Sequence, residues 1–133
     1  MFIKIMKLIE LTKKMISLPS YSDGDLFESP MTNFLLTYMK NAYPWLQITT
    51  QKIAPNRYNI FATDGMPCSL LVVNQLDTVQ PTTDWTIAPL IPTEKDGKIF
   101  GLGSSDSKGN IAAFLTALSS VKKTIGLSIL WYV

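Results

Sequence analysis

Two short segments with uninterrupted apolar runs, residues 69–76 and 126–133, constrain the fold of this 133-residue chain more than any other feature. Each segment is far shorter than the ~18 residues that a membrane-spanning helix needs. Each has the length of a strand, and an apolar run without alternation is typical of a strand that is buried on both faces. Both segments are therefore predicted to be buried strands of a sheet that is covered by helices.

Helical periodicity precedes and separates these strands. Residues 1–18 have the pattern of an amphipathic helix that ends before a proline. A second helix is predicted to begin at Pro30, after a capping Ser29, and to end before Pro44. Residues 111–123 are the third predicted helix. The apolar residues expected to share one side of the first two helices are Ile5, Leu8, Ile9, Met15 and Ile16, and Met31, Phe34, Leu35, Tyr38 and Met39.

Further strands are predicted at residues 46–53, 57–63 and 98–100, where β-branched and aromatic residues are frequent. Residues 80–92 contain three prolines and are predicted to form a long loop, and residues 101–110 form a second loop rich in small side chains. Helices that alternate with buried strands favour a layered α/β domain, and a chain of this length suffices for one domain.

The charge and the composition exclude several classes of protein. Twelve Lys and Arg against ten Asp and Glu, without a basic stripe, argue against a nucleic-acid partner. Neither a membrane span nor a secretory signal is recognisable, so we expect no membrane partner and a cytoplasmic location. The single Cys68 excludes a disulfide framework. The absence of histidine excludes Ser-His-Asp and Cys-His catalysis, and any histidine-ligated metal site made by this chain alone.

The sequence ends on an apolar strand, residues 126–133, with neither a polar tail nor a closing helix. Natural domains rarely end on a strand that looks central. We therefore expect this chain to be the opening part of a longer protein.

Two carboxylates stand where α/β sheets bind ligands. Asp77 follows the strand that ends at Leu76, and Asp106 lies in a loop of Gly and Ser ahead of a helix. Ligands of open α/β sheets bind at the carboxyl ends of the strands, and two converging acids repel each other unless a cation or a proton lies between them. The pair points to a metal site, and the alternative is that Asp106 only caps the following helix.

The same loop excludes two phosphate-binding motifs. A dinucleotide fingerprint, G-x-G-x-x-G, needs a glycine where Asp106 stands, and a carboxylate there repels a pyrophosphate. A P-loop ends in Gly-Lys-Ser/Thr, whereas here Lys108 precedes Gly109. An intact nucleotide-binding α/β domain is therefore kept only as a third alternative.

Two separated motifs resemble those of a known family. Residues 70–79, LLVVNQLDTV, are followed by Trp85 and then by residues 96–109, DGKIFGLGSSDSKG. This order resembles the M20 family of zinc-dependent peptidases and deacylases, which includes acetylornithine deacetylase and succinyl-diaminopimelate desuccinylase. In that family a buried strand leads into His-x-Asp-Thr-Val-Pro, and a later loop carries Gly-Arg-Gly-Ser-x-Asp-x-Lys-Gly. The Gly-Leu-Gly-Ser variant found here leans towards the acetylornithine deacetylase-like branch.

The resemblance implies a three-layer α/β/α zinc-peptidase-like catalytic domain, truncated, of which residues 1–133 are the N-terminal portion. It implies metal-dependent hydrolysis of N-acyl amino acids or peptide bonds. Asp106 would bridge two zinc ions, and Asp77 would orient and polarise the metal ligand two residues before it. The family has histidine at that ligand position, where this chain has Gln75. A neutral amide oxygen is a weaker zinc ligand than an imidazole nitrogen.

Other positions also depart from the family pattern, namely Gln80, Leu102 and Ser107. The resemblance places the catalytic glutamate and the remaining ligands after the strand at residues 126–133. It also implies Zn²⁺ or Co²⁺ in the parent family, small-molecule substrates of amino-acid metabolism, and a homodimer for full-length members.

With so few ligands, this chain is expected to retain no catalytic metal and to be inactive by itself, because a catalytic zinc usually has three protein ligands. The alternative hypothesis is a non-catalytic remnant that binds a partner through residues 126–133 as an uncapped edge strand.

Overall fold

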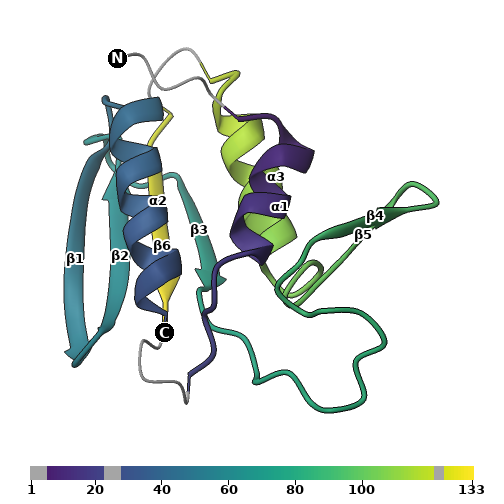
Figure 1. Cartoon of the computed structure of the whole chain (residues 1–133). Helices are drawn as coiled ribbons and strands as arrows, with labels where there is room; N and C mark the ends of the chain where they lie inside the picture. Colours follow the sequence, from purple (N-terminus) through teal and green to yellow (C-terminus); the bar gives the residue numbers. More distant parts are fainter. Residues whose placement is uncertain (1–5, 23–27, 122–124) are drawn as a thin grey trace.

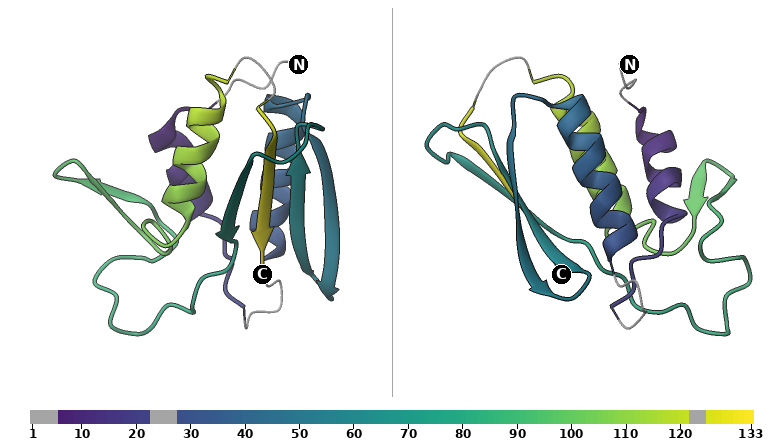
Figure 2. Two further views of the ribbon diagram at one scale, coloured as in Figure 1. Left: turned by 180° about the vertical axis from the view of Figure 1, so that it is seen from behind. Right: turned by 60° about the vertical axis from the view of Figure 1, so that its left-hand side comes forward.

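A computed structural model of the chain describes residues 6–22, 28–121 and 125–133 as a sheet with helices on one side (Figure 1). In chain order the elements are α1 (Leu8–Ile16), α2 (Ser29–Ala42), β1 (Gln47–Ala54), β2 (Arg57–Thr63), β3 (Leu70–Gln75), β4 (Thr93–Lys95), β5 (Lys98–Phe100), α3 (Lys108–Leu118) and β6 (Leu127–Tyr132). The right-hand view of Figure 2 shows the sheet as one layer and the helices as a second. The α/β class predicted from the sequence is confirmed.

The main sheet has the strand order β1-β2-β6-β3. β1 and β2 form an antiparallel hairpin, β6 lies antiparallel to β2, and β3 lies parallel to β6 on its other side. Parallel strands need a long crossover connection, and α3 lies within the one that leads from β3 to β6. The last strand therefore lies inside the sheet, and the prediction that residues 126–133 form an uncapped edge is wrong.

The core lies between the sheet and the helices. In the register of β2 and β6, Ile60 stands opposite Trp131 and Ala62 opposite Ile129, and all four side chains are fully buried. The buried helical side chains that pack against them include Leu11, Met15, Met31, Leu35, Met39, Ile111, Leu115 and Leu118. Burial of each such large side chain contributes about 1.5–3 kcal/mol, so this face of the sheet holds the helices in place.

The helix α1 is shorter than predicted and presents a different side to the core. It begins at Leu8, and residues 1–5 of the predicted helix, Ile5 among them, lie outside the described residues. Leu8 and Ile9 are 42% and 49% exposed, so the prediction that they face the core is wrong. Leu11 takes that place because α1 packs on α3. The buried members of the predicted set are Met15 and Ile16.

The helix α2 agrees with its predicted periodicity. Its predicted core side chains Met31, Leu35, Tyr38 and Met39 are buried, and Phe34 is partly buried. The helix begins one residue before Pro30, so Ser29 is its first residue and Glu28 occupies the cap position. That buried Glu28 pairs with Arg57 of β2 at 3.0 Å, which ties the start of the helix to the sheet.

The helix α3 begins at Lys108, three residues earlier than predicted, and ends at Leu118. Residues 122–123 of the predicted helix lie outside the described residues. Within the described part of the chain, none of the helices is long and apolar enough to cross a bilayer.

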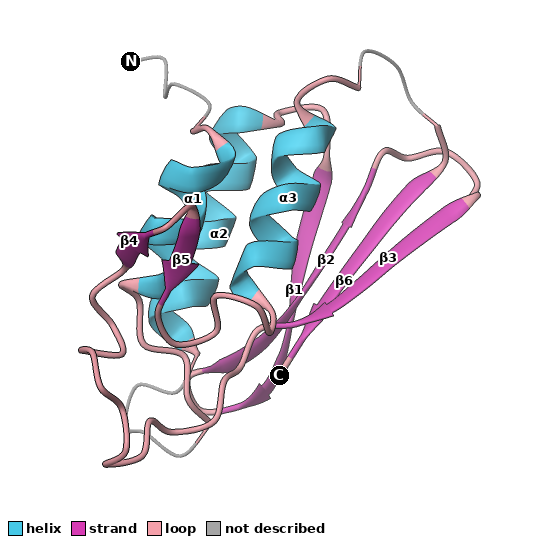
Figure 3. Cartoon of the chain, turned by 90° about the vertical axis from the view of Figure 1, so that its right-hand side faces the viewer, coloured by secondary structure: helices cyan, strands magenta, loops and turns pink. Residues whose placement is uncertain are grey.

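The strand β3 is more exposed than its apolar sequence predicts. Leu70, Leu71 and Val73 are each about half exposed, so the prediction of burial on both faces is wrong for the part of the chain that the structure describes. The reason is that the helices cover one side of the sheet, and no described strand pairs with the outer edge of β3 (Figure 3). The apolar edge of this fold is therefore β3.

A separate two-stranded hairpin, β4-β5, follows the long loop at residues 80–92. The sequence predicts β5 but not the short β4. Lys13 of α1 donates a hydrogen bond to Glu94 of β4 at 2.6 Å, so the hairpin lies beside α1 on the helical side of the molecule (Figure 1).

Candidate functional site

The three residues singled out from the sequence line one cavity at the carboxyl end of β3. This cavity has a volume of about 310 Å³, and Gln75, Asp77 and Asp106 all contribute to its wall. The remaining lining comes from Thr78, Val79 and residues 101–105. Gln75 and Asp77 are partly buried and Asp106 is exposed, so the three residues line a depression that solvent can reach.

The chain around Asp77 is fixed by backbone contacts on both sides. The Leu76 amide donates to the carbonyl of Tyr132 at 2.8 Å, which extends the pairing of β3 with β6 up to the site. The Thr78 amide donates to the carbonyl of Ser20 at 2.8 Å, and this contact joins the segment to the chain that follows α1. Asp77 is therefore held between two anchored neighbours.

The loop that carries Asp106 is tied to the end of β3 through the next residue. The Ser107 hydroxyl donates to the carbonyl of Gln75 at 3.0 Å, and the Asn74 side-chain amide donates to the carbonyl of Ser107 at 3.4 Å. The Lys108 amide donates to the carbonyl of Gly103 at 2.9 Å and closes the loop on itself. These bonds bring Asp106 to the strand end where Asp77 lies.

Two glycines of this loop are required by their surroundings. Gly103 has φ +75°, and a Cβ there would lie 2.9 Å from Cγ2 of Thr78. A Cβ on Gly109 would lie 2.3 Å from the carbonyl oxygen of Ser104, closer than side-chain carbons approach backbone oxygens in proteins. The small residues noticed in the sequence therefore let the loop fold tightly against the start of α3.

The interpretation of Asp106 as a simple helix cap is not supported. The cap position of α3 is occupied by Ser107, and no side-chain cap hydrogen bond is made there. Asp106 lies one residue earlier and lines the cavity instead. The hypothesis that Asp106 only caps the following helix is therefore wrong, and the position of its carboxylate has to be explained in another way.

Sequence reasoning missed Lys108 as a buried anchor of the helix that follows the site loop. Its side chain is 1% exposed, and Nζ donates to the carbonyl of Leu18 at 2.7 Å, which links the start of α3 to the end of the α1 segment. Burial lowers the pKa of Lys108 from 10.5 to about 8. The signal was present, because Lys108 precedes Ile111 and Leu115 at helical spacing and so falls on the buried stripe of α3.

Comparison with known proteins relates this chain to one family of peptidases. Residues 71–129 match the profile of peptidase family M20/M25/M40. The acetylornithine deacetylase of Photorhabdus laumondii is 34% identical over 128 residues, an alignment that covers 91% of this chain and 33% of that enzyme. This chain is similar to the M20 peptidases. The chain spans about a third of the length of the curated relatives it matches.

A second M20 relative shows the same relationship. The succinyl-diaminopimelate desuccinylase of Nautilia profundicola is 31% identical over 121 residues, covering 91% of this chain and 32% of that enzyme.

Two solved structures share the fold. The M20 family metallo-carboxypeptidase Sso-CP2 of Sulfolobus solfataricus superimposes with a TM-score of 0.82 at 19% identity, covering 96% of this chain and 31% of that protein. Human carnosine dipeptidase 1 gives a TM-score of 0.75 at 17% identity, covering 94% of this chain and 31% of that protein. These likenesses show that the chain has the fold of that part of an M20 peptidase.

The donor set of the cavity does not complete an M20 metal centre. Its lining includes two acidic residues, Asp77 and Asp106, together with Gln75. The described residues include no group of three or more His, Cys, Asp or Glu that could hold a metal ion, and the chain has no histidine. A catalytic zinc usually takes three protein ligands from nitrogen, sulfur and carboxylate donors. The described residues that line this cavity therefore do not by themselves supply three such ligands.

Proposed function

We propose that this chain carries part of the active site of a metal-dependent amide hydrolase of the M20 type. The supporting observation is that Gln75, Asp77 and Asp106, from two separate motifs, line a single cavity at the end of β3. We assign to Asp106 the role of metal carboxylate and to Asp77 the orientation of the ligand at position 75. Two carboxylates in the wall of one cavity favour a bound cation, and they disfavour the phosphate groups of a nucleotide.

The proposed reaction is hydrolysis of an N-acyl amino acid or a small peptide, with Zn²⁺ or Co²⁺ as the metal and a cytoplasmic setting. The curated relatives are a deacetylase and a desuccinylase by name, and both hydrolyse an acyl group from an amino-acid derivative. We further propose that residues 1–133 are the N-terminal portion of a single catalytic domain, and that the remaining ligands belong to the two thirds of an M20 enzyme that this chain does not span. By itself the chain is then predicted not to turn over substrate.

The substitution Gln75→His tests the metal site directly. It restores the ligand that the family motif carries, because an imidazole nitrogen binds Zn²⁺ and Co²⁺ better than an amide oxygen does. We expect Co²⁺ binding, followed by its visible absorption spectrum, to tighten by at least about tenfold. The matched control is Gln51→His on the exposed strand β1, which places the same side chain far from the cavity and should leave Co²⁺ binding unchanged.

The outcome that contradicts the proposal is equal Co²⁺ affinity for the two histidine variants. Adding Asp106→Asn to the Gln75→His chain should remove the gain, whereas adding Asp96→Asn in the β4-β5 turn should not. Incubation of the unmodified chain with Nα-acetylornithine and Zn²⁺ or Co²⁺ is expected to give no turnover above a buffer blank. Turnover under those conditions would disprove the predicted inactivity.

A second candidate function is favoured by the exposure of β3. Leu71 and Val73 are 52% and 50% exposed on an edge strand, and an exposed apolar edge is a template for pairing with another strand. A non-catalytic interaction domain would therefore bind its partner along β3, and not along residues 126–133 as expected from the sequence. A chain that stays monomeric in light scattering at high concentration would count against this alternative.

A further inference from the structure

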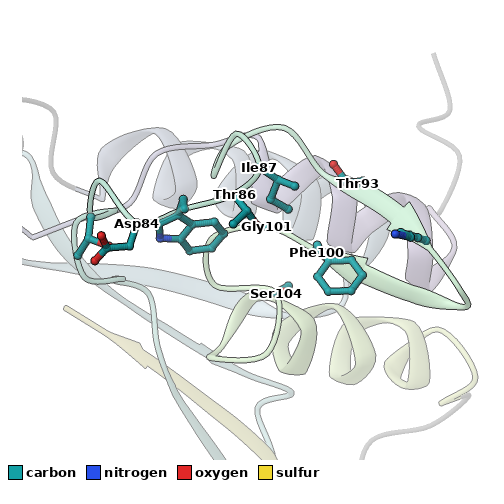
Figure 4. A pocket seen from close by; sticks show the side chains of 10 residues that line it. Asp84, Thr86, Ile87, Thr93, Phe100, Gly101 and Ser104 are labelled. Carbon is teal, nitrogen blue, oxygen red and sulfur yellow. The ribbon is translucent and has the colours of Figure 1, made fainter.

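A second and larger cavity adjoins the candidate metal site. Its volume is about 560 Å³, within the range of small-molecule binding sites. Gly101 and Ser104 line both cavities, so the two share a wall. Figure 4 shows this second cavity between the long loop that carries Asp84 and the β4-β5 hairpin that carries Phe100.

The lining of the second cavity combines aromatic rings with aliphatic side chains. Trp85 and Phe100 are 36% and 42% exposed, and Ile87 joins them in the wall. Large apolar side chains that line an open cavity favour an apolar group of a ligand, because its binding removes both surfaces from water.

Opposite charges stand at the two ends of this cavity. Asp84 lies at one end and Thr93 with Phe100 at the other (Figure 4). Lys95 belongs to the second end, because residues two apart on a strand share a face and Thr93 is its neighbour on β4. Glu94 points the other way and pairs with Lys13. Among the described residues, neither Asp84 nor Lys95 takes part in an ion pair.

We propose that this cavity is a binding site for small zwitterionic amides with an apolar side chain. The carboxylate of Asp84 receives the ligand's ammonium group, the ammonium of Lys95 receives its carboxylate, and Trp85 with Phe100 contacts the apolar side chain. The inference rests on the proposed function, because the wall shared through Gly101 would place the scissile amide of such a ligand next to the Asp77 and Asp106 cavity. Unblocked dipeptides with one aromatic residue have this chemistry.

Three related ligands test the two charged ends separately. They are alanyl-phenylalanine, its N-acetyl derivative, which lacks the ammonium group, and its C-terminal amide, which lacks the carboxylate. Binding is followed by amide and indole shifts in NMR spectra of the ¹⁵N-labelled chain in EDTA, so that metal plays no part. Because an exposed ion pair is worth up to about 1 kcal/mol, we expect each blocked ligand to bind about threefold more weakly than the dipeptide.

Charge-neutral variants assign each end. Asp84→Asn should abolish the preference for the dipeptide over its N-acetyl derivative and keep the preference over the amide. Lys95→Gln should do the reverse. An Asp96→Asn variant, on the turn of the same hairpin but outside the lining, serves as the control and should keep both preferences.

The aromatic wall has matched controls elsewhere in the chain. Trp85→Ala and Phe100→Ala should each weaken dipeptide binding about fivefold. Trp45→Ala and Phe61→Ala remove rings of 37% and 42% exposure that lie outside the cavity, and both should bind as the unmodified chain does. The indole shifts should follow Trp85 and disappear in Trp85→Ala.

The proposal is overturned if the three ligands bind equally, or if the variants outside the cavity lose as much affinity as those within it. Its failure is distinguishable from failure of the metal site. If the dipeptide binds in EDTA but Gln75→His does not bind Co²⁺ more tightly, the proposed binding site stands and the proposed metal-dependent hydrolase is disproved. If Gln75→His binds Co²⁺ more tightly but the dipeptide does not bind, the metal site stands and the proposed binding site is disproved.

Discussion

The two faces of the sheet have similar side chains but different surroundings. On the helical face, Ile129 and Trp131 of β6 are fully buried. On the other face, Leu130 is only partly buried, and its register partners Phe61 of β2 and Val73 of β3 are 42% and 50% exposed. Figure 3 shows the helices on the first face and none on the second.

This difference shows what an apolar strand sequence does and does not specify. A continuous apolar run predicts a strand and a capacity for burial on both faces. It does not show which of the two faces the helices cover, because the side chains on both faces of β3 are apolar. The apolar sides of the helices decide which face is covered, and Leu71 and Val73 on the open face stay 52% and 50% exposed.

The largest expected effect compares one substitution on the two faces. Leu127→Ala removes a side chain that is 1% exposed on the helical face and should lower the free energy of unfolding by about 3 kcal/mol. Leu71→Ala removes the same atoms from a side chain that is 52% exposed and should cost less than about 1 kcal/mol. Urea unfolding followed by far-UV circular dichroism measures both.

Equal losses for the two leucines would break this comparison. That result would mean that the open face is covered in solution, either by a second copy of this chain or by another part of the same chain. Repeating Leu71→Ala at several protein concentrations separates the two cases, because stability gained by self-association rises with concentration.

A second prediction concerns how β6 is held in the middle of the sheet. The carboxylate of Asp64, just after β2, accepts hydrogen bonds from the amides of Ile125 at 2.8 Å, Gly126 at 2.9 Å and Met66 at 3.1 Å. Backbone hydrogen bonding at Leu127 is the largest influence on the pKa of Asp64, and with the other three it outweighs burial and lowers the pKa below its ordinary value of 3.8.

The sign of the pH dependence follows from that lowered pKa. A carboxylate whose folded-state pKa is depressed stabilises the fold above its unfolded pKa, and this contribution is lost as the pH falls through the folded value. Asp64→Asn should therefore be less stable than the unmodified chain at pH 7, and the gap between them should shrink below about pH 4. Thermal unfolding at a series of pH values checks this, and a gap that does not change with pH would show that Asp64 acts by packing alone.

The smallest expected effect on stability is at the edge strand. Val73→Lys places a charge on the open face of β3 and should change the free energy of unfolding by about 0.5 kcal/mol or less. It should reduce self-association measured by light scattering, because charged side chains protect exposed edges. Thr49→Lys, at the exposed position on the same face of β1, is the control. If both variants reduce association equally, net charge rather than the β3 edge explains the effect.

Much of the fold follows from local sequence patterns. The periodicity of α2, with Met31, Leu35 and Met39 on one side, and the β-branched run at Arg57–Thr63 predict their elements nearly to the residue. Among the helices, the errors lie at α1 and α3, and among the strands they lie in the burial of β3 and in the edge position expected for residues 126–133. The spacing predicts Leu8 and Ile9 in the core, whereas α1 turns Leu11 to α3 instead. Spacing shows that a helix has an apolar side and does not show which neighbour that side contacts.

The candidate site likewise has residues that the sequence predicts and others that only the structure shows. The positions of Asp77 after a buried strand and of Asp106 in a loop of Gly and Ser single out the two acids, and the resemblance to a known family adds Gln75. All three line one cavity of the structure. Lys108 was overlooked because a lysine on a buried stripe is unusual. The second cavity was not foreseen, because its wall joins the loop of Asp84 to the hairpin of Lys95, and that contact is made only on folding.

The sequence by itself determined the elements, the loop glycines and the acidic residues, because these depend on neighbours along the chain. Only the tertiary structure decided that β6 lies between β2 and β3, that one face of the sheet stays open, and that two cavities share a wall. Those properties depend on contacts between residues far apart in the chain, and local pattern carries no information about which distant surfaces meet.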